Sequence, residues 1–406
     1  MSFSILRALV LLTDVLLAVG SGAALADKKY GPGVTDTEIK IGQTYPYSGP
    51  LSGYATIARA ETAYFAKINA EGGINGRKIN LISLDDGFSP PKTVEQTRRL
   101  VEQEEVLFIF GSLGTATNTA IHKYMNAKKV PHIFLATGAT KWGDPQNYPW
   151  TMGGVQLAYQ SEAHIYAKYI LLNKPAAKIA VLYQNDDLGK DYLKGLKDGL
   201  GAKASQMIVA ESTYEAADPT VDSQIVSLQT SGADTFLSIT TPKAAGQAIR
   251  KVYDMGWKPL YIQALISSSV ETVLKSAGLE KSVGIISVAI IKDPTDPQWA
   301  DDPALKDYQA WMKQYFSDGN IADGLNVAGY TIAQTLVQVL KQCGEDLTRE
   351  NVMRQAANLK DLALPMLIPG IKVNTSPTDF YPIEQGQMMR FDGKRWVLFG
   401  PILDKQ

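Results

Sequence analysis

Short apolar runs alternate with longer amphipathic segments along most of the chain. Apolar runs bounded by turn residues predict strands, and apolar residues spaced three or four positions apart predict helices. The first part of the chain is predicted to form strands at residues 39–45, 78–85, 106–111 and 133–136, separated by helices at 55–69, 93–103 and 115–127. This alternation predicts a mainly parallel sheet that is covered on both faces.

The alternation starts again near residue 153. The predicted strands are 178–183, 206–211, 235–240, 260–264 and 283–290, and the predicted helices are 158–172, 191–200, 221–230, 244–255 and 270–275. Two series of this size predict an α/β protein with two doubly wound, Rossmann-like lobes. Residues 291–406 add helices and a β-rich end, and we expect this segment to complete the other two lobes.

The composition is that of a globular protein, with 45% hydrophobic and 20% charged residues among 406. The formal net charge is −1, and no long run of one charge follows the N-terminal segment. A basic surface for nucleic acid or for an acidic membrane is therefore not expected.

The first 26 residues have the pattern of a secretory signal peptide. Arg7 precedes an apolar stretch, and Ala24-Leu25-Ala26 fits a cleavage site of the A-x-A type. We expect cleavage after Ala26 and export to the periplasm. Asp14 interrupts the apolar stretch, and this argues against the alternative, an N-terminal membrane anchor.

Known catalytic signatures, such as the Walker P-loop or the G-x-S-x-G elbow, are not found in the sequence. His122, His132 and His164 are dispersed, and Cys343 is the only cysteine, so neither an internal disulfide nor a zinc site is expected. The acidic pairs at 85–86 and 186–187 are interpreted as helix caps or solvated groups rather than acid–base catalysts. We expect a binding protein rather than an enzyme, with no metal and no cofactor.

Two strand ends run into turns of small and hydroxyl residues, at 106–121 (VLFIFGSLGTATNTAI) and 132–140 (HIFLATGAT). A helix N-terminus leaves N–H groups without partners, and its dipole favours negative charge. Such turns suit an anion that is held and later released. Ordinary helix capping is the alternative interpretation.

Several segments resemble the type I periplasmic binding proteins for branched-chain amino acids. They are IKIGQTYPYSGPL (39–51), INAEGGINGRKINLISLDD (68–86), 106–111 with Thr115, 131–140 and 179–192, in the expected order. The resemblance implies two lobes joined by three hinge crossings near residues 152, 289 and 366. Lobe I would comprise 27–152 plus 289–366, and lobe II 153–288 plus 367–406. It also implies a monomer that closes over a ligand and delivers it to the permease and ATPase subunits of an ABC importer.

The resemblance implies a carboxylate site on lobe I. In the leucine/isoleucine/valine-binding relatives, two strand-end turns hold the ligand carboxylate, and these match Leu113-Gly114-Thr115 and Gly138-Ala139-Thr140. Hydroxyl and backbone N–H groups of Thr115 and Thr140 would bind the anion. Tyr54 matches an aromatic wall beside the ligand, and Tyr47 and Tyr159 are further candidates.

The sequence departs from the family at the ammonium site. The relatives use a tyrosine and a glutamate of the second lobe, and these positions fall on Thr241 and Leu265. Residues 261–266 contain no acid, so an ammonium buried there would lack a counter-ion, at a cost of several kcal/mol. We therefore expect an apolar or aromatic carboxylate without an α-ammonium, and the resemblance suggests acids such as benzoate, phenylacetate or hydroxycinnamates.

Two alternatives remain open at this point. The first is an amino-acid-binding protein whose ligand ammonium is held by other groups, for example Asp186, Asp187 or Gln263. The second is a ligand-sensing domain that does not serve a permease.

Overall fold

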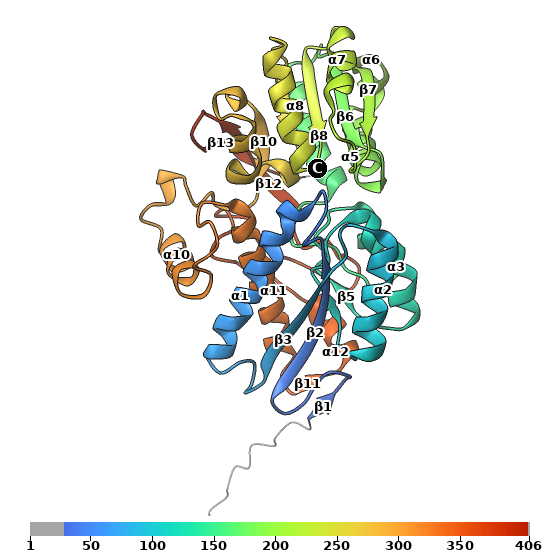
Figure 1. Cartoon of the computed structure of the whole chain (residues 1–406), viewed down its shortest axis with the longest axis vertical. Coiled ribbons are helices and arrows are strands. Elements are labelled where there is room, and N and C mark those ends of the chain that lie inside the picture. Colours follow the sequence, from blue (N-terminus) through green and yellow to red (C-terminus); the bar gives the residue numbers. More distant parts are fainter. Residues whose placement is uncertain (1–27, 405–406) are drawn as a thin grey trace, which may run out of the picture.

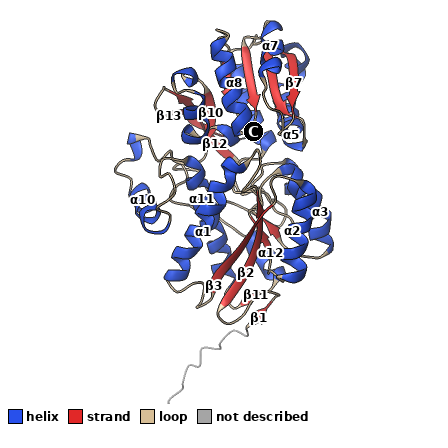
Figure 2. Ribbon diagram, in the orientation of Figure 1, coloured by secondary structure: helices blue, strands red, loops and turns tan. Residues whose placement is uncertain are grey.

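The computed structural model describes residues 28–404, and the predicted signal peptide lies outside them. The chain forms two lobes, each built around its own sheet (Figure 1). Helices flank both sheets (Figure 2), as the alternating pattern predicted. The two-lobed α/β fold with parallel-sheet lobes is therefore confirmed.

Lobe I contains a four-stranded parallel sheet in the order β3-β2-β4-β5. A short parallel pair, β1 with β11, lies at its far end. The elements of lobe I are β1 (Lys29–Tyr30), β2 (Glu38–Tyr45), α1 (Ala55–Ala70), β3 (Lys78–Asp85), α2 (Pro90–Arg98), β4 (Ile109–Phe110), α3 (Thr115–Ala127), β5 (His132–Ile133), α10 (Pro303–Tyr315), α11 (Gly324–Cys343), β11 (Asp346–Leu347) and α12 (Arg349–Ala356).

Lobe II contains a seven-stranded sheet in the order β13-β12-β10-β9-β8-β6-β7. β12 pairs antiparallel with β10 and with β13, and the other pairs are parallel. The elements of lobe II are α4 (Tyr159–Asn173), β6 (Ile179–Gln184), α5 (Asp187–Leu200), α6 (Ala204–Met207), β7 (Ile208–Tyr214), α7 (Asp222–Thr230), β8 (Thr235–Ile239), α8 (Pro242–Asp254), β9 (Leu260–Gln263), α9 (Lys275–Ala277), β10 (Ile286–Ala289), β12 (Gln385–Phe391) and β13 (Trp396–Asp404).

Two predicted strands of lobe I are much shorter in the structure. The apolar runs 106–111 and 133–136 are reduced to β4 and β5, of two residues each. Positive φ angles at Gly111 (62°) and Phe134 (53°) turn the backbone out of the extended conformation at these points. The buried residues that follow form loops at the edge of the cleft between the lobes.

The predicted helices at 93–103 and 270–275 also differ from the structure. The first continues α2 as a π-helical turn, Arg99–Gln103, and the second is a π-helical turn, Val270–Leu274, that leads into α9. By contrast, α3 and β3 have the predicted bounds. Short π-helical segments have no distinct apolar periodicity, which explains why the pattern did not separate them from α-helix.

The chain passes between the two sheets three times, after β5, after β10 and before β12. Single bridges tie these crossings to each other: Ile291 pairs with Leu367, and Leu157 pairs with Ile383. The lobe boundaries given above stay predictions. Among residues 28–404, no helix is long and apolar enough to cross a membrane, and no cluster of metal-ligating side chains is found.

Candidate functional site

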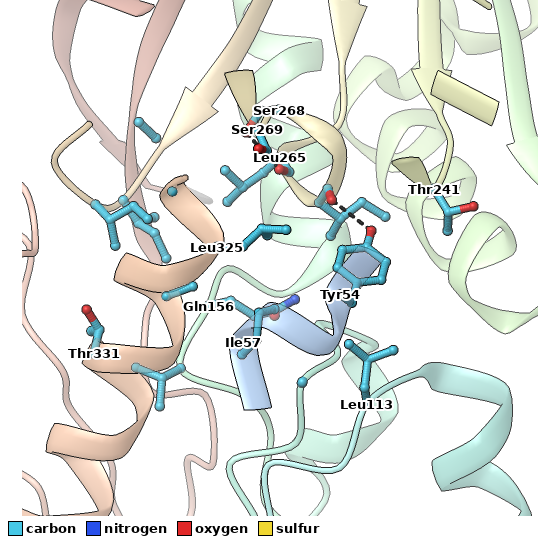
Figure 3. Close-up of a pocket in the computed structure, with 18 of the residues that line it drawn as sticks. Tyr54, Ile57, Leu113, Gln156, Thr241, Leu265, Ser268, Ser269, Leu325 and Thr331 are labelled. Carbon is cyan, nitrogen blue, oxygen red and sulfur yellow. Dashed lines mark hydrogen bonds between the residues drawn. The ribbon is translucent and has the colours of Figure 1, made fainter. Parts of the chain in front are cut away.

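A cavity of about 180 Å³ lies between the two lobes, where both sheets and the crossings meet. Most of its wall is apolar (Figure 3). Lobe I contributes side chains from the start of α1, from the loop after β4 and from α11, and lobe II contributes the segment after β9. The apolar and aromatic lining residues are Leu51, Tyr54, Ile57, Phe88, Leu113, Ala136, Val155, Tyr159, Leu188, Leu265, Ile266, Val270, Ala289, Ile290, Ile291, Ala322, Leu325, Ala328, Met389 and Trp396.

The N-terminus of α3 opens onto this cavity through Leu113, Gly114 and Thr115. Gly114 has φ 103°, and a Cβ there would approach the Phe88 ring to 2.5 Å, so the turn requires glycine. In the described part of the chain, the N–H groups of residues 115–117 have no hydrogen-bond acceptor. These donors and the helix dipole favour a negative group at this end of the cavity.

Of the two threonine hydroxyls of the predicted carboxylate site, that of Thr115 has a partner within the protein, whereas the buried hydroxyl of Thr140 has none among the described residues. The Thr115 hydroxyl bonds the Thr137 hydroxyl at 2.7 Å, and the Tyr159 hydroxyl donates to the same oxygen of Thr137 at 3.3 Å. Thr115 and Tyr159 line the cavity, and both are buried. A ligand anion would therefore meet the backbone N–H groups at the start of α3 rather than a free threonine hydroxyl.

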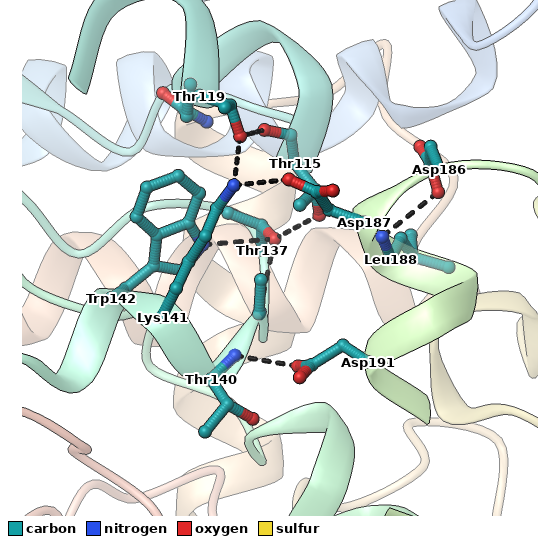
Figure 4. A network of polar contacts seen from close by, with 12 residues as sticks. Thr115, Thr119, Thr137, Thr140, Lys141, Trp142, Asp186, Asp187, Leu188 and Asp191 are labelled. Carbon is teal, nitrogen blue, oxygen red and sulfur yellow. Dashed lines mark hydrogen bonds and ion pairs between the residues drawn. The ribbon is translucent and has the colours of Figure 1, made fainter. Parts of the chain in front are cut away.

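The second predicted turn, Gly138-Ala139-Thr140, does not line the cavity. The N–H of Thr140 donates to Oδ2 of Asp191 on α5 at 2.7 Å (Figure 4). The Tyr381 hydroxyl donates to the Thr140 carbonyl. A Cβ on Gly138 would lie 2.5 Å from the Leu157 carbonyl oxygen, so this turn packs directly against the first crossing. The structure thus does not bring the two predicted turns together around one ligand.

On lobe II, Thr241 and Leu265 line the cavity. The Thr241 hydroxyl contacts the Tyr214 hydroxyl at 3.2 Å. The side chain of Leu265 is partly buried and belongs to the short 3₁₀ turn Leu265–Ser267. The position at which the family places an acid therefore presents hydrocarbon to the cavity.

A buried acid that the sequence reasoning missed, Glu162 of α4, lies behind Leu265. Its Oε1 accepts the Leu265 N–H at 2.8 Å and the Tyr166 hydroxyl at 2.7 Å, and its Oε2 accepts the Tyr192 hydroxyl at 2.7 Å. Burial raises the pKa of Glu162 to about 7, against the lowering effect of these three donors. Because its oxygens already have partners and it does not line the cavity, Glu162 is not a free counter-ion for a ligand.

The two lobes touch on both sides of the cavity. The Tyr54 hydroxyl of lobe I donates to the Ile266 carbonyl of lobe II at 2.7 Å. Lys141 forms an ion pair with Asp187 at 2.5 Å. Asp323, the N-cap of α11, accepts the Ser269 hydroxyl at 2.9 Å. These contacts define a closed arrangement in which the cavity is bounded by both lobes.

Residues 38–395 match the family model described as periplasmic binding protein. The chain belongs to this family of periplasmic binding proteins. Among curated relatives of this binding protein, the Leu/Ile/Val-binding protein homolog 7 of Brucella abortus is 24% identical over 331 residues, which are 79% of this chain and 81% of that protein.

Solved structures agree with the fold of this binding protein. A branched-chain amino acid ABC transporter protein from Thermus thermophilus with bound valine superposes with a TM-score of 0.81 at 15% identity, covering 91% of this chain and 97% of that one. A fatty acid ABC transporter substrate-binding protein from Thermomonospora curvata superposes with a TM-score of 0.73 at 24% identity, covering 93% and 95%. Chains similar in fold therefore have names that point to different ligands.

The cavity of the binding protein brings together most of the predicted site residues. Those that line it are Tyr54, Leu113, Gly114, Thr115, Tyr159, Thr241 and Leu265, whereas Gly138, Ala139 and Thr140 do not. The three side chains considered for an ammonium are engaged elsewhere. Asp186 caps α5, Asp187 pairs with Lys141, and the Gln263 amide donates to the Ser238 carbonyl and the Thr240 hydroxyl.

The sequence reasoning missed several polar residues of the wall, which are Gln156, Gln184, Ser268, Ser269, Lys292, Asp293 and Thr331, and three of these belong to the crossings. Gln156 belongs to the first crossing, and Lys292 and Asp293 follow β10 in the second. No motif marks them, because crossings are irregular segments whose side chains meet the cavity only after both lobes have folded. Their place immediately after a predicted strand or before a predicted helix is the only signal that the sequence contains.

Proposed function

We propose that this chain is the solute-binding subunit of an ABC importer and binds a small apolar or aromatic carboxylate in the interlobe cavity. The observation that carries the proposal is Leu265, which puts hydrocarbon where the relatives place the acid that binds an ammonium. The N–H donors at the start of α3 suit the carboxylate, and the apolar wall suits the rest of the ligand. On this proposal, Thr140 supports closure of the lobes rather than ligand binding.

The two charged side chains of the described cavity wall, Lys292 and Asp293, support a ligand that has a carboxylate and no ammonium. Lys292 lines the cavity, and its ammonium pairs with Asp302 at 2.5 Å. Asp293 is the only acid of the wall among the described residues, and its Oδ1 accepts two hydrogen bonds from Thr295. Burial raises the pKa of Asp293 and favours its neutral form.

An amino acid is the second candidate, and two observations favour it. The Brucella relative is named for leucine, isoleucine and valine, and the Thermus thermophilus structure has bound valine. In addition, Oδ2 of Asp293 has no hydrogen-bond partner among the described residues, so this carboxyl has capacity for one more donor. If the ligand has an α-ammonium, Asp293→Asn should reduce its affinity by at least tenfold, while a simple carboxylate should be little affected.

The shape of the apolar wall favours a ligand with a hydrocarbon body. Leu325, Ile57 and Leu265 face one another in the close-up of the cavity (Figure 3). A structural neighbour with this fold is named as a fatty acid ABC transporter substrate-binding protein, and a fatty acid is a carboxylate with a hydrocarbon body and no amine. A ring or a short branched chain would replace water against these side chains, at about 25 cal/mol per Å² of apolar surface buried.

A thermal-shift screen with matched acids tests the proposal. Leucine and 4-methylpentanoate differ only by the α-amine, and benzoate and phenylacetate extend the series to aromatic acids. A ligand at 100 times its dissociation constant should add about 2.7 kcal/mol to the free energy of unfolding. We expect stabilisation by the acids without an amine. Stabilisation by leucine alone would assign the chain to the second candidate.

Delivery to a membrane permease, export through a signal peptide cleaved after Ala26, and a monomeric state complete the proposal. They are supported by the family and by the N-terminal sequence pattern. Secretion of the full chain in a bacterial host, followed by N-terminal sequencing and light scattering, tests the cleavage site and the monomeric state. Uptake of labelled ligand by cells that lack the gene tests delivery.

A further inference from the structure

Gln156 is the polar side chain of the cavity wall that makes no hydrogen bond to the described protein, whereas Asp293 has partners at Oδ1 and only its Oδ2 is unpaired. Every other polar side chain lining the cavity has at least one partner within the described protein, including Tyr54, Thr241 and Lys292. Gln156 makes no side-chain hydrogen bond in this part of the chain, although its amide has two donors and an acceptor. Figure 3 shows it reaching between Ile57 and Leu325.

The backbone around Gln156 is held firmly by its neighbours. Val155 and Leu157 are buried, Leu157 pairs with Ile383 in a parallel bridge, and the Tyr159 N–H donates to the Gly138 carbonyl at 2.7 Å. A Cβ on Gly154 would lie 2.1 Å from the Leu135 carbonyl oxygen, so the crossing packs closely on lobe I. The amide is therefore presented from a fixed segment rather than from a free loop.

We propose that Gln156 determines specificity by binding a neutral hydrogen-bonding group, a hydroxyl or carbonyl, on the apolar body of the ligand. An amide among hydrocarbon side chains loses its water when the ligand enters, and it regains a hydrogen bond only if the ligand offers one. A plain hydrocarbon body would leave the amide unpaired. The inference rests on the proposed function, since it assumes that a small acid occupies this cavity.

The first test needs no ligand and compares Gln156→Leu with Gln184→Leu. Gln184 also lines the cavity, but its amide donates to Asp186 at 2.6 Å and accepts the Tyr214 hydroxyl at 3.3 Å. We expect Gln184→Leu to lower the melting temperature, because it removes the donor to Oδ2 of Asp186 and one partner of the Tyr214 hydroxyl, and Gln156→Leu to leave it equal or higher. A similar loss in both variants would show that the Gln156 amide has a structural role, and this would overturn the inference.

The second test measures the binding of four matched probes by calorimetry, for wild type and for Gln156→Leu. The probes are 3-phenylpropanoate, 3-(4-hydroxyphenyl)propanoate, phenylalanine and tyrosine, which differ by an α-amine, by a hydroxyl, or by both. We expect wild type to bind the hydroxylated member of a pair about tenfold more tightly, and Gln156→Leu to reduce this ratio to about one.

The two axes of this set of probes, the amine and the hydroxyl, separate the two claims. The amine axis reports on the proposed function, since preference for phenylalanine and tyrosine would contradict it while leaving the hydroxyl ratio measurable. An equal hydroxyl ratio in wild type and Gln156→Leu would overturn the role of Gln156 alone. If wild type binds none of the four probes, both claims fail for aromatic acids.

Discussion

The backbone N–H of Thr140 in lobe I donates to Oδ2 of Asp191 in lobe II at 2.7 Å. A turn whose sequence suits a carboxylate thus binds one, but the carboxylate belongs to the protein. Gln160 holds the other oxygen, Oδ1 of Asp191, at 2.7 Å, so the acid is fixed in position. The contact joins the two lobes and makes Asp191 part of the closed arrangement.

Asp191→Ala should shift the lobes toward an open arrangement. A hydrogen bond to a charged group contributes about 1.5–3 kcal/mol in favourable settings, and Asp191 is partly exposed, so we expect the lower end of this range. Small-angle X-ray scattering without ligand should show a larger radius of gyration. Asp198→Ala is the control, because Asp198 pairs with Lys194 inside α5. Superimposable scattering from Asp191→Ala and wild type would contradict the role of this contact.

Tyr54→Phe should weaken ligand binding while leaving lobe I intact. The variant removes the hydroxyl that donates to the Ile266 carbonyl across the cleft and retains the ring in the cavity wall. Loss of about 1 kcal/mol from the closed state predicts a roughly fivefold lower affinity for phenylacetate by calorimetry. Tyr47→Phe is a matched control, because its hydroxyl bonds Ser83 within lobe I. Equal affinities of Tyr54→Phe and Tyr47→Phe would show that the hydrogen bond from Tyr54 to Ile266 does not stabilise the closed arrangement.

Glu162 should make stability fall as pH rises. Burial raises its pKa from the ordinary 4.5 to about 7, so the folded protein binds this proton more tightly than the unfolded chain. The stability contributed by the protonated acid is complete below pH 4.5 and is lost as the pH rises to about 7. Glu162→Gln should remove this component, which denaturant unfolding at pH 5 and pH 8 would detect.

The control for this pH effect is Glu95→Gln on the exposed surface of α2. It should keep the pH dependence of wild type, and Glu162→Gln should flatten it. Parallel pH profiles for all three proteins would show that Glu162 does not titrate between pH 5 and pH 8.

Leu265→Glu should shift ligand preference toward α-amino acids. The change places an acid on the cavity wall at the family's ammonium position, and an opposite charge would then partner the ligand amine. We expect leucine to gain affinity and phenylacetate to lose at least tenfold in competition measurements. Leu265→Met is the control for packing. Unchanged phenylacetate affinity in Leu265→Glu would show that this side chain does not contact the ligand.

Local sequence signals predicted much of the fold. The bounds of α3 and β3 follow from apolar periodicity and from the glycine before α3, all within short stretches of chain. The same local signals found the cavity-lining turn at Gly114. They overestimated β4 and β5, because an apolar run shows burial but not the positive φ of Gly111 and Phe134 that ends the sheet.

The parts of the site that the sequence did not predict depend on contacts between distant segments. The sequence predicts that Thr140 binds the ligand. Its true partner, Asp191, lies on the other lobe, and no local pattern shows that the two residues meet. Glu162 was missed because it approaches Leu265 from a helix 103 positions away in the sequence. Gln156 belongs to no sequence motif. Its side chain stands out only in the structure, where the other polar side chains of the cavity wall each have a hydrogen-bond partner.

Calorimetric titration of wild-type protein with phenylacetate and with phenylalanine tests the central claim most directly. The cavity wall has hydrocarbon at Leu265, and the nearby acid Glu162 already has three hydrogen-bond donors. The account predicts binding of phenylacetate and at least tenfold weaker binding of phenylalanine, because Leu265 offers no charge to an ammonium and burial favours the neutral form of Asp293, the acid of the described wall. Tight binding of phenylalanine with no binding of phenylacetate would contradict it.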